Sequence, residues 1–160
     1  MKEKTIVALS TARGKSAIAV IRMSGEDSVE IAKKMFAPMP KEANMLKVGR
    51  LQTKNFVEHA MCVYFVAPHS YTGENMVEFH CHGGPAVVQA VIEACLESGA
   101  VPAQNGEFSK RAFVNGKQNL TNAEGIIEMI EAETASAAKA GATLMENKLG
   151  KKIVDLQDRL

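Results

Sequence analysis

The stretch MVEFHCHGGPAVVQAVIEACL, residues 76–96, decides the fold of this chain. Its first residues alternate, with Val77 and Phe79 on one side of an extended backbone and polar side chains on the other, which predicts a β-strand. Two glycines and Pro85 follow, and proline is favoured at the first position of a helix. Apolar side chains then recur on one helical face until Gly99 ends the helix. The stretch therefore predicts a strand that leads directly into an amphipathic helix.

The rest of the first 117 residues shows elements of the same two kinds. Further strands are predicted at residues 5–9, 17–23, 47–53, 60–66 and 100–104. Ser24 is a candidate N-cap for a helix, and a short helix is predicted over residues 107–114. The proline-containing segment APMPKEAN, residues 37–44, is predicted as a surface loop. The predicted fold class is α+β, a mixed β-sheet with flanking helices.

The last quarter of the chain is predicted as helical. Thr121 and Glu124 have the spacing of a capping box, and no proline follows up to Leu160. Leu149, Ile153, Leu156 and Leu160 form an apolar stripe. We expect a long helical segment over residues 118–160, part of a second domain or of a dimer, with Gly141 or Asn147 as candidate breaks. A self-contained hairpin of two helices is the alternative. The domains expected are thus 1–117 and 118–160.

The composition is that of a globular protein. The chain has 160 residues, 46% of them hydrophobic and 23% charged, and its net charge of +1 indicates no bulk attraction to nucleic acid. Neither a signal peptide nor a membrane span is predicted. The three cysteines form no C-x-x-C pair, which favours reduced thiols in a cytoplasm.

The segment TARGKS, residues 11–16, resembles the end of a phosphate-binding loop. That loop needs an additional glycine five positions before Gly14, where this chain has Leu9. It also needs a helix directly afterwards, whereas an apolar run typical of a strand follows. We therefore interpret the segment as a basic turn between two strands.

Two polar residues occupy predicted strands where packing alone would not place them. Arg22 lies at the end of an apolar strand, and Glu78 lies between apolar neighbours, where a carboxylate is costly unless it is paired or faces a ligand. Arg22 could instead pair with Glu26 or Asp27, and Glu78 could be exposed on an open sheet face.

Two further groups of side chains allow more than one interpretation. His80 and His82 share a strand face, but zinc needs three or four converging ligands and no spacing here provides them, so a metalloenzyme is a weak alternative. Basic residues after Gly106 alternate with Phe108 and Phe113, which we interpret as core residues in preference to stacking platforms for nucleic acid.

Three blocks of this sequence resemble one known family. They are AIAVIRMSG (17–25), SYTGENMVEFHCHGGPAVV (70–88) and GEFSKRAFVNGKQNLTNAE (106–124). In order and spacing they are similar to the tRNA modification GTPases called MnmE or TrmE, over essentially the whole chain. One departure lies at residues 12–16, where the family usually has a turn rich in Pro-Pro-Gly.

The resemblance implies a multidomain, dimeric GTPase whose N-terminal domain has a folate-binding fold like that of the aminomethyltransferases. Its GTP, Mg and K sites would lie outside this chain, so this chain alone should not hydrolyse GTP. With a flavoprotein of the MnmG type, the family modifies the 5-position of the wobble uridine in tRNA. The cofactor implied is a tetrahydrofolate derivative, in the 5-formyl or methylene form. Block by block, the family's folate contacts correspond to Arg22, Glu78 and Lys117.

These implications leave two main functions open. The first is a folate-binding, dimerising N-terminal part of a tRNA modification GTPase, which is cytoplasmic and has no membrane contact. The second is a ligand-free dimerisation module in which Arg22, Glu78 and Lys117 form salt bridges.

Overall fold

A computed structural model describes residues 3–146 of the chain. It has two compact units, residues 1–111 and 112–160. The predicted apolar stripe from Leu149 to Leu160, and the candidate break at Asn147, lie outside the described residues.

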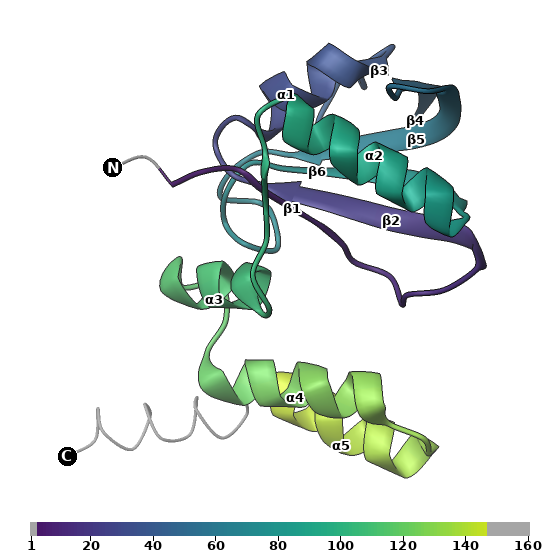
Figure 1. Ribbon diagram of the computed structural model, residues 1–160. Coiled ribbons are helices and arrows are strands. Elements are labelled where there is room, and N and C mark those ends of the chain that lie inside the picture. The colour runs from purple at the N-terminus through teal and green to yellow at the C-terminus, as the bar shows by residue number, and fades with distance from the viewer. Residues whose placement is uncertain (1–2, 147–160) are drawn as a thin grey trace. The chain divides into compact units, whose positions relative to one another are not determined.

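The first unit is built on a seven-stranded sheet with the order β3-β4-β5-β6-β2-β1-β7 (Figure 1). The strands are β1 (Ile6–Leu9), β2 (Ser16–Ser24), β3 (Phe36–Ala37), β4 (Lys47–Gln52), β5 (Val57–Phe65), β6 (Met76–Gly83) and β7 (Val101–Pro102). All neighbours are antiparallel except β1 and β7, which are parallel. The sheet is therefore mixed, as the sequence predicts.

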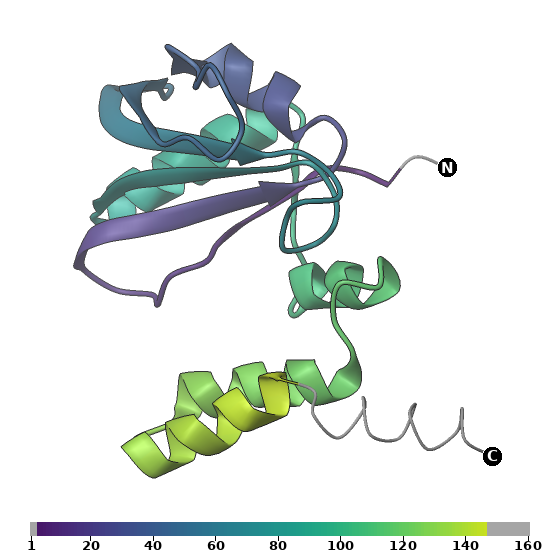
Figure 2. The same cartoon turned by 180° about the vertical axis from the view of Figure 1, so that it is seen from behind.

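Helices α1 (Ser28–Met35) and α2 (Pro85–Glu97) pack on the sheet. Alternation along β2 and β6 points Ile21, Val77 and Phe79 into a single core together with the buried face of α1, and all three are fully buried. Figure 2 shows the sheet from the other side, with α2 behind it. The predicted helix start at Pro85 is confirmed, with Gly84 as its N-cap.

The structure corrects two expectations near the first helix. Helix α1 does not begin at Ser24, which is the last residue of β2, and its N-cap is Asp27. The Ser24 hydroxyl is instead buried, 2.7 Å from the Thr72 hydroxyl and 2.6 Å from a Glu74 carboxylate oxygen. The loop predicted over residues 37–44 begins one residue later than predicted, at Pro38, because Phe36 and Ala37 form an edge strand, β3, that pairs with β4.

The second unit contains a helical hairpin. Helix α3 (Glu107–Val114), predicted correctly, begins in the first unit and ends in the second. It is followed by α4 (Leu120–Glu131) and α5 (Ala135–Met145), which pack against each other. A single long helix was therefore the wrong expectation for the described part: the chain turns at residues 132–134, and Thr134 caps the second helix.

Two details of the hairpin differ from the sequence patterns. The capping box of α4 is formed by Asn119 and Asn122, not by Thr121 and Glu124. Gly141 does not break the helix but allows close packing, because a Cβ there would lie 2.9 Å from the Gly125 carbonyl oxygen. The small residues thus serve the contact between α4 and α5.

Two further observations bear on the environment of the chain. None of the described helices is long and apolar enough to cross a membrane. The three cysteines are free thiols and are buried. Burial raises the pKa of Cys62 and Cys95 to about 12, so both are unreactive thiols at neutral pH.

Candidate functional site

Arg22 and Glu78 form an ion pair across the centre of the sheet. They are directly opposite each other in the β2–β6 register. The Arg22 Nε and Nη2 atoms each lie 2.7 Å from Glu78 Oε1. The side chains are 26% and 15% exposed, so the pair is partly shielded from water. Arg22 therefore pairs with Glu78 and not with Glu26 or Asp27, and the Glu78 side chain is largely shielded from solvent.

The second carboxylate oxygen of Glu78, Oε2, makes fewer polar contacts than Oε1. His80 Nε2 lies 3.5 Å from Glu78 Oε2, and this buried nitrogen has no hydrogen-bond partner within residues 3–146. Arg22 takes only Oε1, so Oε2 remains as a shielded acceptor beside a cation.

Two aromatic rings enclose the guanidinium of Arg22. Its Cζ atom lies 5.2 Å from the ring centroid of Tyr71 and 5.9 Å from that of Phe108. Phe108 is therefore partly buried against a charged group, and Phe113 is exposed, so the interpretation of both as core residues was wrong. Tyr71 was not identified from sequence, although it lies in one of the blocks that carry the family resemblance.

A cluster of charges around Arg111 holds these rings in place. The Arg111 side chain is 9% exposed and donates to Glu74 at 3.0 Å, to Glu107 at 2.9 Å and to the Lys4 carbonyl at 3.0 Å. Burial alone would raise the pKa of Glu107, but the Gln104 N–H and the Arg111 guanidinium outweigh it and lower that pKa. Because Glu74 follows Tyr71 and Glu107 precedes Phe108, the cluster ties both ring-bearing segments together.

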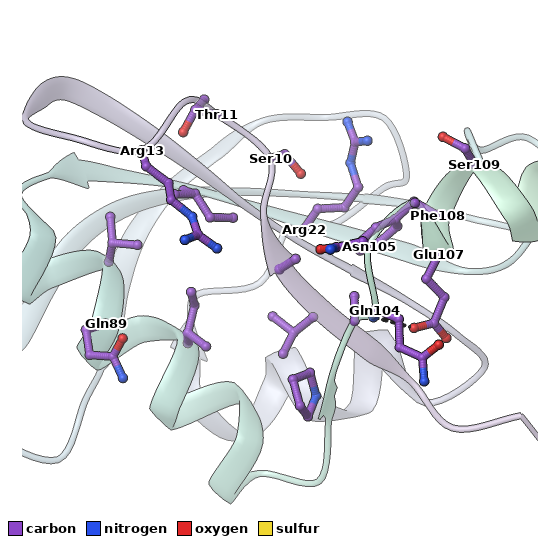
Figure 3. A pocket seen from close by; sticks show the side chains of 18 of the residues that line it. Ser10, Thr11, Arg13, Arg22, Gln89, Gln104, Asn105, Glu107, Phe108 and Ser109 are labelled. Atoms are coloured by element: carbon purple, nitrogen blue, oxygen red, sulfur yellow. Dashed lines mark hydrogen bonds between the residues drawn. The ribbon is translucent and has the colours of Figure 1, made fainter. Parts of the chain in front are cut away.

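A cavity of about 840 Å³ opens beside Arg22 (Figure 3). It is lined by Arg22, Tyr71 and Phe108, by the end of β1, by Arg13 in the turn after it, and by one face of α2. Glu78 does not line the cavity itself and is connected to it only by its ion pair with Arg22. The volume is in the range of ligand sites, roughly 300–1,000 Å³.

The edge of β1 adds an unpaired peptide group to this cavity. Strand β7 covers β1 only at Ile6 and Val7. The Ser10 N–H donates to the Val20 carbonyl, so alternation turns the peptide group of Leu9 away from β2 and toward the free edge. Within residues 3–146 no backbone group pairs with Leu9 on that side. The cavity thus combines aromatic and apolar walls with the unpaired N–H and carbonyl of Leu9 and with the guanidinium groups of Arg13 and Arg22.

The other residues considered from sequence lie elsewhere. Lys117 belongs to the second unit, follows α3, is exposed, and has no ion pair within residues 3–146. His82 is bonded to Glu58, with 2.6 Å between His82 Nδ1 and Glu58 Oε1. No group of three or more His, Cys, Asp or Glu side chains in the described part could hold a metal ion.

The chain is similar to the family described as "GTP-binding protein TrmE N-terminus" over residues 5–117. Proteins named tRNA modification GTPase MnmE match it almost from end to end. The one from Endomicrobium trichonymphae is 42% identical over 99% of this chain and 35% of its own length. Those from Acaryochloris marina and Thermus thermophilus are 41% and 40% identical over 99% and 97% of this chain, and 37% of their own lengths.

The chain thus spans about a third of the length of the curated relatives it matches. This similarity agrees with the mixed sheet and flanking helices of the first unit. The chain belongs to the TrmE family, also called MnmE, and residues 5–117 match the family's N-terminal domain.

Proposed function

We propose that this chain is the tetrahydrofolate-binding, dimerising N-terminal part of a cytoplasmic tRNA modification GTPase. In the whole protein it would act with a flavoprotein of the MnmG type at the 5-position of the wobble uridine of tRNA. The relatives' name and their similarity along the entire chain support the GTPase and tRNA parts of this proposal.

The observation that carries the folate site is Arg22 at the wall of a ligand-sized cavity, with Glu78 paired to it. A reduced pterin is planar and presents N–H donors, which a carboxylate oxygen such as Glu78 Oε2 can accept. Tyr71 and Phe108 offer apolar surface beside it. In this proposal Glu78 accepts hydrogen bonds from the pterin, and Arg22 and Lys117 bind polar or anionic parts of the folate. Calorimetric titration with 5-formyltetrahydrofolate tests it, and no binding would refute it.

A ligand-free dimerisation module is the second candidate. It is favoured by the ion pair itself, because Arg22 and Glu78 satisfy each other without a ligand. The sheet face that α1 and α2 do not cover also has apolar side chains in adjacent positions. Val48, Met61 and Val20 lie in one cross-strand row on it, with His80 between Met61 and Val20, and Val48 is 67% exposed.

We expect this chain to sediment as a dimer at tens of micromolar, since a second copy would remove that apolar face from water. Val48→Glu would place a charge in the contact and raise the dimer dissociation constant at least about tenfold. The matched control is Val66→Glu, an exposed valine that follows β5. A monomer at all concentrations, or equal effects of the two variants, would contradict this interface.

The chain itself should not bind GTP. Leu9 stands where a phosphate loop needs glycine, and strand β2 begins at Ser16, so no helix N-terminus faces Gly14 and Lys15. Titration with a fluorescent GTP analogue should show no saturation in the micromolar range. Saturable binding that Lys15→Ala abolishes would contradict the expectation.

A further inference from the structure

The charges on the cavity wall do not balance. Arg22 is neutralised by Glu78, and Glu107 is neutralised by Arg111. Arg13 also lines the cavity, and within residues 3–146 its side chain has neither an ion pair nor a hydrogen bond. An anionic group that enters the cavity would therefore meet one uncompensated cation, at Arg13.

The turn that carries Arg13 is attached to the sheet on both sides. The Ser10 N–H donates to the Val20 carbonyl at 2.8 Å, and the Val20 N–H donates to the Thr11 hydroxyl at 3.3 Å. Gly14, with φ of +127°, then reverses the chain into β2. Figure 3 shows Arg13 reaching from this turn toward Gln89 of α2, at a different part of the wall from Arg22.

We infer that Arg13 is a specificity-determining residue that holds the carboxylates of the folate's glutamyl tail. The inference rests on the proposed function, in which the pterin head lies at Arg22 and Glu78. A folate is bipolar, with a planar head at one end and two carboxylates at the other. The wall has separate sites for the two ends, and a guanidinium is suited to carboxylates because it donates in a planar fork.

The experiment compares 5-formyltetrahydrofolate with its dimethyl ester, which removes both negative charges of the tail and adds only two methyl groups. Calorimetry gives dissociation constants for the unmodified chain, for Arg13→Gln and for Lys15→Gln. Lys15 is the matched control because it is a cation in the same turn that does not line the cavity. Arg13 is exposed and contacts no described partner, so its replacement should leave the melting temperature unchanged.

The unmodified chain and Lys15→Gln should bind the acid about fivefold more tightly than the ester, as expected for a partly exposed ion pair. Arg13→Gln should lose most of this preference, so that its affinity for the acid approaches its affinity for the ester. If Arg13→Gln keeps the preference for the acid, or if Lys15→Gln loses it equally, the role of Arg13 is refuted while folate binding stands. If the unmodified chain binds neither ligand, the proposed function fails as well.

Discussion

Replacing Glu78 with glutamine should weaken the binding of 5-formyltetrahydrofolate about ten- to hundredfold, which corresponds to about 1.5–3 kcal/mol for a charge-assisted pairing. The substitution keeps the shape of the side chain but turns one of its two acceptors into a donor, so a pterin N–H would face another N–H. The affinity is measured by calorimetry and the melting temperature on the same samples.

The ion pair changes what we expect for stability. Replacing a lone buried carboxylate with an amide would be neutral or stabilising, but Glu78 is paired with Arg22. The amide oxygen can still accept from Arg22, so the loss should be only about 1 kcal/mol. Glu30→Gln is the control, because it removes the same charge from an exposed pair with Lys33.

The two candidate functions give opposite results for this variant. A ligand site predicts a large loss of affinity and a small change in melting temperature. A scaffold predicts a lower melting temperature while folate affinity, if there is any, is unchanged. The second pattern would leave the ligand-free dimerisation module as the better account of Arg22 and Glu78.

Arg111→Met should lower the free energy of unfolding by about 3 kcal/mol, because it leaves partly buried carboxylates without their cation. Arg111 is the one partner shared by Glu74, Glu107 and the Lys4 carbonyl in the described part of the chain. Lys110→Met is the matched control, since Lys110 is the exposed neighbour on the same helix and has no ion pair within residues 3–146. Urea unfolding at pH 7 measures both variants.

The effect of Arg111→Met should depend on pH with a definite sign. The pKa of Glu107 is lowered in the folded chain, so the stability that it contributes is present above its unfolded pKa and is lost as the pH falls through the folded value. The difference between the unmodified chain and Arg111→Met should therefore shrink in acid, at pH values below the usual range of a glutamate. A difference that is independent of pH would show that the variant acts through packing.

Local sequence patterns were sufficient for most elements of the first unit. An apolar run identified β2, alternation identified β6, and Pro85 identified the start of α2. Side-chain direction and the allowed φ of proline are properties of a few adjacent residues. The same patterns marked Arg22 and Glu78 as unusual, since a charge among apolar neighbours is visible within one strand.

Other features depended on contacts that no local window contains. Thr121 and Glu124 have a capping-box spacing, yet Asn119 and Asn122 cap the helix, and Asn122 also donates to the carbonyl of Met145 on α5. The absence of proline after Thr121 is also compatible with either one long helix or two shorter ones. Close packing of Gly125 against Gly141 stabilises the hairpin, and this stabilisation exists only when both α4 and α5 are folded.

By itself the sequence determined the family, the α+β class, and which residues carry charge inside strands. Only the tertiary structure decided that Arg22 and Glu78 pair with each other, that aromatic rings enclose Arg22, and that Arg13 reaches the same cavity. The reason is physical: strand propensity and alternation act between neighbours, whereas these contacts follow from strand order and register. Arg22 and Glu78 are 56 residues apart, and the β2–β6 register alone brings them together.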